Sequence, residues 1–130
     1  MQLNFLILIG ELRTRPQIVT GEKNFTLREL DFYLNGYYCA KRNFSQLEPI
    51  EYEFRQYFEK FILKKFNVTI DKKRVKWETV ITENSKNDED SIKNFLDLFD
   101  EFYKMILNKE LEKYLDEYDD DDDDENINDL

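Results

Sequence analysis

The sequence of 130 residues contains no histidine, one cysteine, two prolines and three glycines. Without histidine, the chain lacks the commonest general base near neutral pH and the commonest metal ligand. A single cysteine, Cys39, excludes an internal disulfide and fits a reducing compartment. The glycines, Gly10, Gly21 and Gly36, stand too far apart to form a phosphate-binding loop. We therefore predict a non-enzymatic protein with no catalytic residues, no cofactor and no metal site.

The chain also lacks a long apolar run. The stretch LNFLILI at residues 3–9 is far shorter than the roughly 20 residues of a membrane-spanning helix. No lysine or arginine precedes it, as one would in a signal peptide. We therefore expect a cytoplasmic protein with no membrane partner.

What the chain does have is apolar residues for a core and an excess of acid. Hydrophobic residues make up 41% of it and aromatic residues 15%, and the net charge is −10. Eight of the acidic side chains lie in residues 119–130, where no base accompanies them. Like charges repel and few apolar side chains accompany them, so this segment should contribute little to folding. We predict one helical domain at 1–118 and an acidic, disordered tail at 119–130.

The charges of the remaining chain are unevenly placed. Residues 60–76 carry seven bases and one acid, whereas residues 88–101 carry six acids and one base. Bases interleaved with Phe61, Phe66 and Trp77 suit nucleic-acid binding in principle, through phosphate contacts and stacking. These aromatic residues mostly fall on the predicted core stripe, however, and the overall charge is negative. We do not expect nucleic acid to be a partner.

Helical periodicity dominates and predicts an all-α fold of about five helices around an aromatic-rich core. The helices are expected at residues 2–14, 26–42, 49–66, 68–84 and 88–118. The first is apolar enough to be a strand instead. The fourth contains VKWETVI, which alternates like a strand, although Trp77, Val80 and Ile81 also share one helix face.

Two helix starts have clear sequence signals. Thr26 and Glu29 match a capping box, and Asn87 can cap the last helix. That helix would span about 45 Å if unbroken, too long for a compact chain of this size. We therefore predict a kink near Asn108 or a projecting end. Because its apolar seam must face the core, the helix should present one acidic patch to solvent, formed by Asp90, Asp97, Asp100 and Glu101.

The helix at 26–42 carries two apolar strips, one more than a surface helix needs. One strip contains Leu27, Leu30, Leu34, Tyr37 and Tyr38, and the opposite one contains Phe32, Gly36 and Cys39. We predict that a second helix covers the latter strip, so that this helix is central. Close packing would then explain Gly36, which is costly within a helix, and would bury Cys39.

Several segments together resemble a family of small bacterial immunity proteins. They are RP at 15–16, Gly21, LRELDFYLNGYYCA at 27–40, FRQYFEKFILKKFNV at 54–68, Trp77 and SIKNFLDLFDEFY at 91–103. The resemblance covers roughly residues 13–103 and consists of packing patterns rather than a catalytic signature. Such proteins are encoded beside polymorphic toxins, including those of contact-dependent growth inhibition.

The resemblance implies an inhibitor that binds one cognate toxin domain in the cytosol of the producing cell. Many such toxins are nucleases with basic sites, which an acidic face would attract. Asp90, Asp97, Asp100 and Glu101 are accordingly the predicted partner-binding residues. Two other classes stay open at this point: an adaptor or regulatory module that binds a different protein, and an acidic mimic of nucleic acid that acts through the aspartate run. The sequence specifies neither the toxin nor the oligomeric state.

Overall fold

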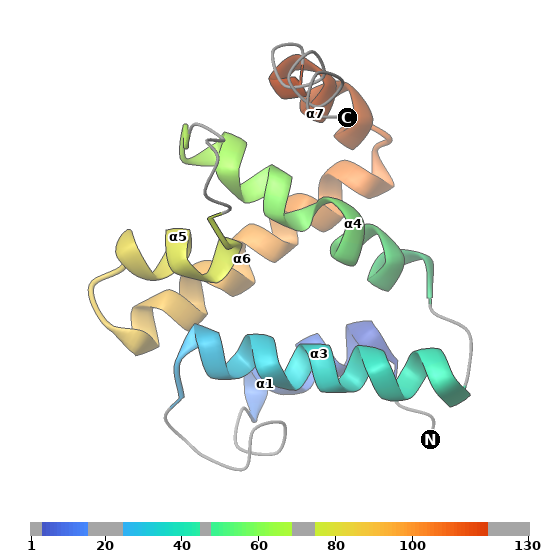
Figure 1. Ribbon diagram of the computed structural model, residues 1–130, viewed down its shortest axis with the longest axis vertical. Helices are drawn as coiled ribbons and strands as arrows, with labels where there is room; N and C mark the ends of the chain where they lie inside the picture. Colours follow the sequence, from blue (N-terminus) through green and yellow to red (C-terminus); the bar gives the residue numbers. More distant parts are fainter. Residues whose placement is uncertain (1–3, 16–24, 45–47, 69–74, 120–130) are drawn as a thin grey trace, which may run out of the picture.

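The computed structural model describes residues 4–15, 25–44, 48–68 and 75–119. Within these ranges the chain forms six helices and no strand (Figure 1), which confirms the all-α prediction. The helices are α1 (Phe5–Thr14), α3 (Leu27–Phe44), α4 (Pro49–Lys65), α5 (Trp77–Glu83), α6 (Asp88–Leu107) and α7 (Leu111–Asp119). Residues 120–130, most of the predicted tail, lie outside the described ranges.

Both segments that could have been strands contain helices. The first apolar run forms α1, which begins after Asn4, whose side chain accepts a hydrogen bond from the Ile7 N–H at 2.8 Å. Within the described part of the segment predicted at 68–84, the helix comprises residues 77–83, and Lys76 precedes it in an extended conformation. Residues 69–74 lie outside the described ranges. None of the described helices combines the length and the apolarity needed to cross a bilayer.

The predicted helix starts are confirmed by their hydrogen bonds. At α3, the Glu29 N–H donates to Thr26 Oγ1 (3.1 Å) and the Thr26 N–H donates to Glu29 Oε1 (2.9 Å), which is a complete capping box. At α6, Asn87 Oδ1 accepts from the Asp90 N–H at 2.8 Å. Pro49 occupies the first turn of α4, where its missing N–H is not needed.

The predicted break near Asn108 is confirmed, and it divides the last helix into α6 and α7. Lys109 has a left-handed backbone (φ 58°), and the N–H groups of Lys109 and Glu110 donate to Ile106 O and Met105 O. This pattern is a Schellman motif, which satisfies the last carbonyl groups of α6. The chain can therefore turn and lay α7 back against the molecule, giving six described helices instead of about five.

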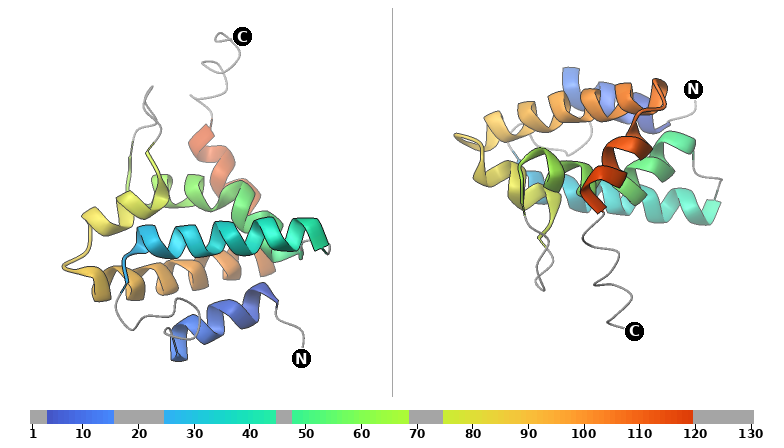
Figure 2. Two further views of the ribbon diagram at one scale, coloured as in Figure 1. Left: turned by 60° about the horizontal axis from the view of Figure 1, so that its bottom comes forward. Right: turned by 90° about the horizontal axis from the view of Figure 1, so that it is seen from above.

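The core is built around α4, which contacts α1, α5, α6 and α7. The ring of Phe58 is fully buried and lies 5.2–6.1 Å, centroid to centroid, from the rings of Phe61, Trp77, Phe95 and Phe102. Helix α3 packs on α5 and α6. In the right-hand view of Figure 2, α3 runs along one side of the molecule and α6 along the opposite side. Their core-facing sides are turned toward each other, so their solvent-facing sides form two separate surfaces.

Candidate functional site

The strip of α3 that was predicted to be covered faces solvent instead. Phe32 is 62% exposed and Tyr33 45%, and Gly36, Cys39 and Ala40 are exposed as well. The guanidinium of Arg28, one turn earlier, lies 6.0 Å from the centroid of the Phe32 ring. The prediction that a second helix covers this strip is therefore wrong within the part of the chain that the structure describes.

The predictions for Gly36 and Cys39 are wrong for the same reason. A Cβ atom built on Gly36 would meet no atom within 4 Å, so close packing by the part of the chain that the structure describes does not explain this glycine. Cys39 was predicted to be buried and is exposed. The physical reason is that α3 packs on its neighbours through the opposite strip, where Leu27, Leu30 and Leu34 are buried. We call the solvent-facing residues Phe32, Tyr33, Gly36, Cys39 and Ala40 the α3 outer face.

The α3 outer face is uncharged. Residues 32–40, FYLNGYYCA, contain no acid and no base, and they span about 12 Å of helix. Among the residues whose exposure the structure describes, the exposed charged side chains of this helix are Arg28 and Glu29, both in its first turn. Asp31 belongs to the other side, where it is buried and lies 3.3 Å from the Lys76 ammonium. An exposed helix face with a large aromatic residue and no charge is typical of a protein-binding surface.

The four acids predicted on α6 do not form one free patch. Asp100 pairs with Arg13 of α1 at 2.8 Å, and Glu101 pairs with Lys65 of α4. Asp90 accepts the Lys86 N–H at 2.9 Å and so belongs to the start of the helix. Asp97 is exposed and makes no ion pair with any described residue. Two of the four carboxylates are thus engaged with bases on different neighbouring helices.

A buried polar cluster joins α3 to α4 and was not predicted. Glu51 is 0% exposed, and neither of its carboxylate oxygens has a hydrogen-bond partner among the described residues. Arg55, one turn later, donates to Asn35 Oδ1 and to the Leu34 carbonyl, and lies 4.6 Å from the centroid of the Tyr38 ring. Burial raises the pKa of Glu51, a shift that the charges of Lys41 and Arg55 partly oppose.

Glu48 extends this cluster to α1. Its Oε2 atom accepts the Phe5 N–H at 2.7 Å and the Lys41 ammonium at 2.9 Å. Lys41 also donates to the Tyr37 hydroxyl at 3.1 Å, and the pKa of that hydroxyl is raised chiefly by burial. Bonds among three helices fix the orientation of α3, and with it the direction of the α3 outer face. One feature of the sequence could have indicated this buried cluster: Glu51 falls on the same helix stripe as Phe54 and Phe58.

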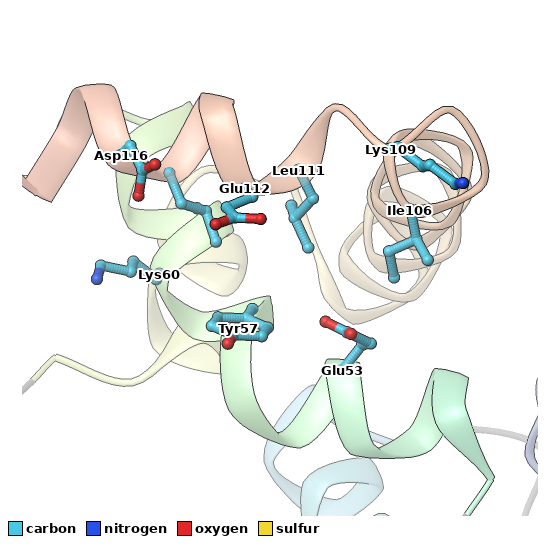
Figure 3. A pocket seen from close by; sticks show the side chains of 9 residues that line it. Glu53, Tyr57, Lys60, Ile106, Lys109, Leu111, Glu112 and Asp116 are labelled. Atoms are coloured by element: carbon cyan, nitrogen blue, oxygen red, sulfur yellow. The ribbon is translucent and has the colours of Figure 1, made fainter.

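A cleft of about 540 Å³ lies between α4, the end of α6 and α7 (Figure 3). Its lining has apolar and aromatic residues (Tyr57, Ile106, Leu111, Leu115), three acids (Glu53, Glu112, Asp116) and two lysines (Lys60, Lys109). No sequence pattern predicted it, because it depends on the turn at Lys109 that folds α7 back. Among the described residues, no three histidine, cysteine or acidic side chains come together in a way that could hold a metal ion.

Three comparisons, with protein-family models, with curated proteins and with solved structures, find no protein similar to this chain. The candidate surfaces are therefore the α3 outer face, the acids of α6 and the cleft beside α7, each defined by the chain's own residues.

Proposed function

We propose that this protein is a non-enzymatic inhibitor, an immunity protein that binds and neutralises a cognate toxin domain through the α3 outer face. The observation that carries the proposal is the 62% exposure of Phe32 on a helix face without charge. A phenylalanine in that position leaves most of its apolar surface in contact with water until a partner covers it. Aromatic residues are enriched, and charged residues depleted, at the centres of protein interfaces.

Gly36 adds a steric reason to the hydrophobic one. In a helix interior, glycine costs about 1 kcal/mol relative to alanine, and no packing by the described residues offsets that cost at Gly36. A glycine without a Cβ lets another backbone approach the helix closely. The partner is therefore expected to place a helix or an extended segment directly over Gly36, beside the ring of Phe32.

The acids of α6 form the second proposed contact, on a surface separate from the α3 outer face. Asp97 is available without breaking an ion pair, whereas a partner would compete with Arg13 for Asp100 and with Lys65 for Glu101. Exposed acids chiefly accelerate the association of a basic partner and add little affinity. For a basic toxin such as a nuclease, we expect α3 to supply the binding energy and α6 to supply electrostatic steering.

The proposal is tested by co-expression with the cognate toxin domain, which we expect to be encoded beside this gene. The wild-type chain should restore growth, whereas Phe32→Ala should weaken binding by about thirtyfold or more and reduce rescue. Leu107→Ala is the matched control, because Leu107 is equally exposed at 63% but lies on α6. Binding is measured by calorimetry with a catalytically inactive toxin variant.

Two outcomes would separate the parts of the proposal. If wild-type protein neither rescues growth nor binds the toxin domain, the immunity function is wrong, and the α3 outer face would belong to a different partner, as in an adaptor. If wild-type protein rescues growth but Phe32→Ala binds as tightly as Leu107→Ala, the function stands and the choice of α3 is wrong.

A further inference from the structure

The cleft beside α7 combines apolar walls with carboxylates that point into it. Leu111 and Leu115 are buried in the molecule at 6% and 4% exposure, and they line the cleft together with Tyr57. Figure 3 shows the carboxyl groups of Glu53 and Glu112 extending into the space between α4 and α7. Neither carboxylate forms an ion pair with another described residue.

The lysines at the cleft do not fill this space. Figure 3 shows the side chains of Lys60 and Lys109 extending outward at opposite ends, away from Glu53 and Glu112. The lining as a whole contains three acids and two lysines, so its charges nearly balance. Because the lysines extend outward, the interior of the cleft is acidic. The volume of about 540 Å³ lies in the range of sites that hold a small ligand or a long side chain with its neighbours.

The position of α7 is fixed, so the cleft exists before any ligand arrives. The Lys64 ammonium donates to the Tyr114 carbonyl and lies 4.0 Å from the centroid of the Tyr114 ring. The rings of Phe61 and Tyr114 lie 5.7 Å apart, centroid to centroid. A preformed site spares its ligand the cost of ordering the protein.

We propose that this cleft binds an arginine side chain of a partner protein, flanked by apolar residues. An arginine carries an apolar stem, which suits Leu111 and Leu115, and a planar cation, which suits the two carboxylates. The guanidinium can also stack on the face of an aromatic ring, and Tyr57 supplies that ring. The inference does not depend on the proposed toxin partner, because it concerns the chemistry of the ligand alone.

The experiment is an NMR titration of the whole ¹⁵N-labelled chain with the peptide acetyl-leucyl-arginyl-leucinamide. The control peptide has citrulline in place of arginine, which keeps the shape of the side chain and removes its charge. The arginine peptide should shift the backbone amide signals of residues 53, 57 and 112, with a dissociation constant on the order of 1 mM. The citrulline peptide should bind about tenfold more weakly or not at all.

Protein variants test the carboxylates. The double variant Glu53→Gln/Glu112→Gln should bind the arginine peptide about tenfold or more weakly than the wild type does. Glu83→Gln/Glu89→Gln, which removes two exposed acids elsewhere, should bind it as the wild type does. Glu112→Gln alone provides a second variant with little risk to folding, because Glu112 is exposed. Equal binding of the two peptides, or equal loss in the cleft and control variants, would overturn the inference.

Discussion

At the scale of single residues, Glu51 occupies a position where the neighbouring turns of α4 place Phe54 and Phe58 in the core. It is fully buried, and its carboxylate accepts no hydrogen bond from the described part of the chain. A buried acid without donors favours its neutral form, which is why burial raises the pKa of Glu51 from the ordinary value of 4.5. The charges of Lys41 and Arg55 act in the opposite direction and are outweighed.

This arrangement gives a pH-dependent contribution to stability with a definite sign. The pKa of Glu51 is higher in the folded chain than in the unfolded chain. Its stabilising contribution is therefore fully present below pH 4.5 and is lost as the pH rises through the pKa of the folded chain. Glu51→Gln stays neutral at every pH, so it should remove this loss and make the chain more stable than the wild type at pH 7, with a difference that shrinks toward pH 4. Urea denaturation at several pH values from 4 to 8 measures the difference. Parallel stability curves for variant and wild type would mean that Glu51 is ionised at little cost.

At the scale of the helix, Gly36 of α3 and Gly10 of α1 form a natural pair for comparison. A Cβ atom on either glycine would meet nothing within 4 Å. Alanine should therefore stabilise the chain at each position by about 0.5–1 kcal/mol, seen as a higher thermal midpoint. The effects on binding should differ: under the proposed function, Gly36→Ala should weaken binding of the toxin domain, because the new methyl group would stand where that partner is expected to approach, and Gly10→Ala should not. Equal binding by both variants would show that no partner backbone reaches Gly36.

The same helix shows where sequence reasoning succeeds and where it stops. The capping box of Thr26 and Glu29 was predictable because its hydrogen bonds join residues three positions apart. The exposure of Phe32 was not, because periodicity reveals an apolar face without revealing how many neighbours are available to cover it. Glu51 and the cleft likewise depend on contacts between distant segments, which no local pattern specifies.

The turn between α6 and α7 carries a measurable strain. Lys109 adopts φ 58°, a conformation that costs a side-chain-bearing residue about 1–2 kcal/mol and that glycine adopts freely. Lys109→Gly should therefore stabilise the chain by about 0.5–1 kcal/mol, after the greater flexibility of glycine in the unfolded chain is counted. Asn67 ends α4 in the same way at φ 55°, and Asn67→Gly should have a smaller effect, because asparagine tolerates this conformation. Thermal denaturation of the two variants compares them directly, and a destabilised Lys109→Gly would contradict the argument.

At the scale of the whole molecule, the acids of α6 both form ion pairs with neighbouring helices and give this surface its negative charge. Asp100 ties α6 to α1 through Arg13, and Glu101 ties it to α4 through Lys65. These side chains are 59% and 47% exposed, so water and salt screen both pairs. Exposed pairs contribute between 0 and about 1 kcal/mol each to stability. The variant Asp97→Ala/Asp100→Ala/Glu101→Ala should therefore remain folded, with a small loss in thermal midpoint.

That modest cost makes the triple variant a clean probe of electrostatic steering. If α6 attracts a basic toxin, the variant should associate more slowly than the wild type at low salt, while the two dissociation rates stay similar. The difference should shrink as the salt concentration rises, since the Debye length falls from about 10 Å at 0.1 M to about 3 Å at 1 M. Surface plasmon resonance at several salt concentrations measures both rates. Identical association rates at every concentration would exclude the α6 acids from the encounter, whereas a faster dissociation would place them inside the bound interface.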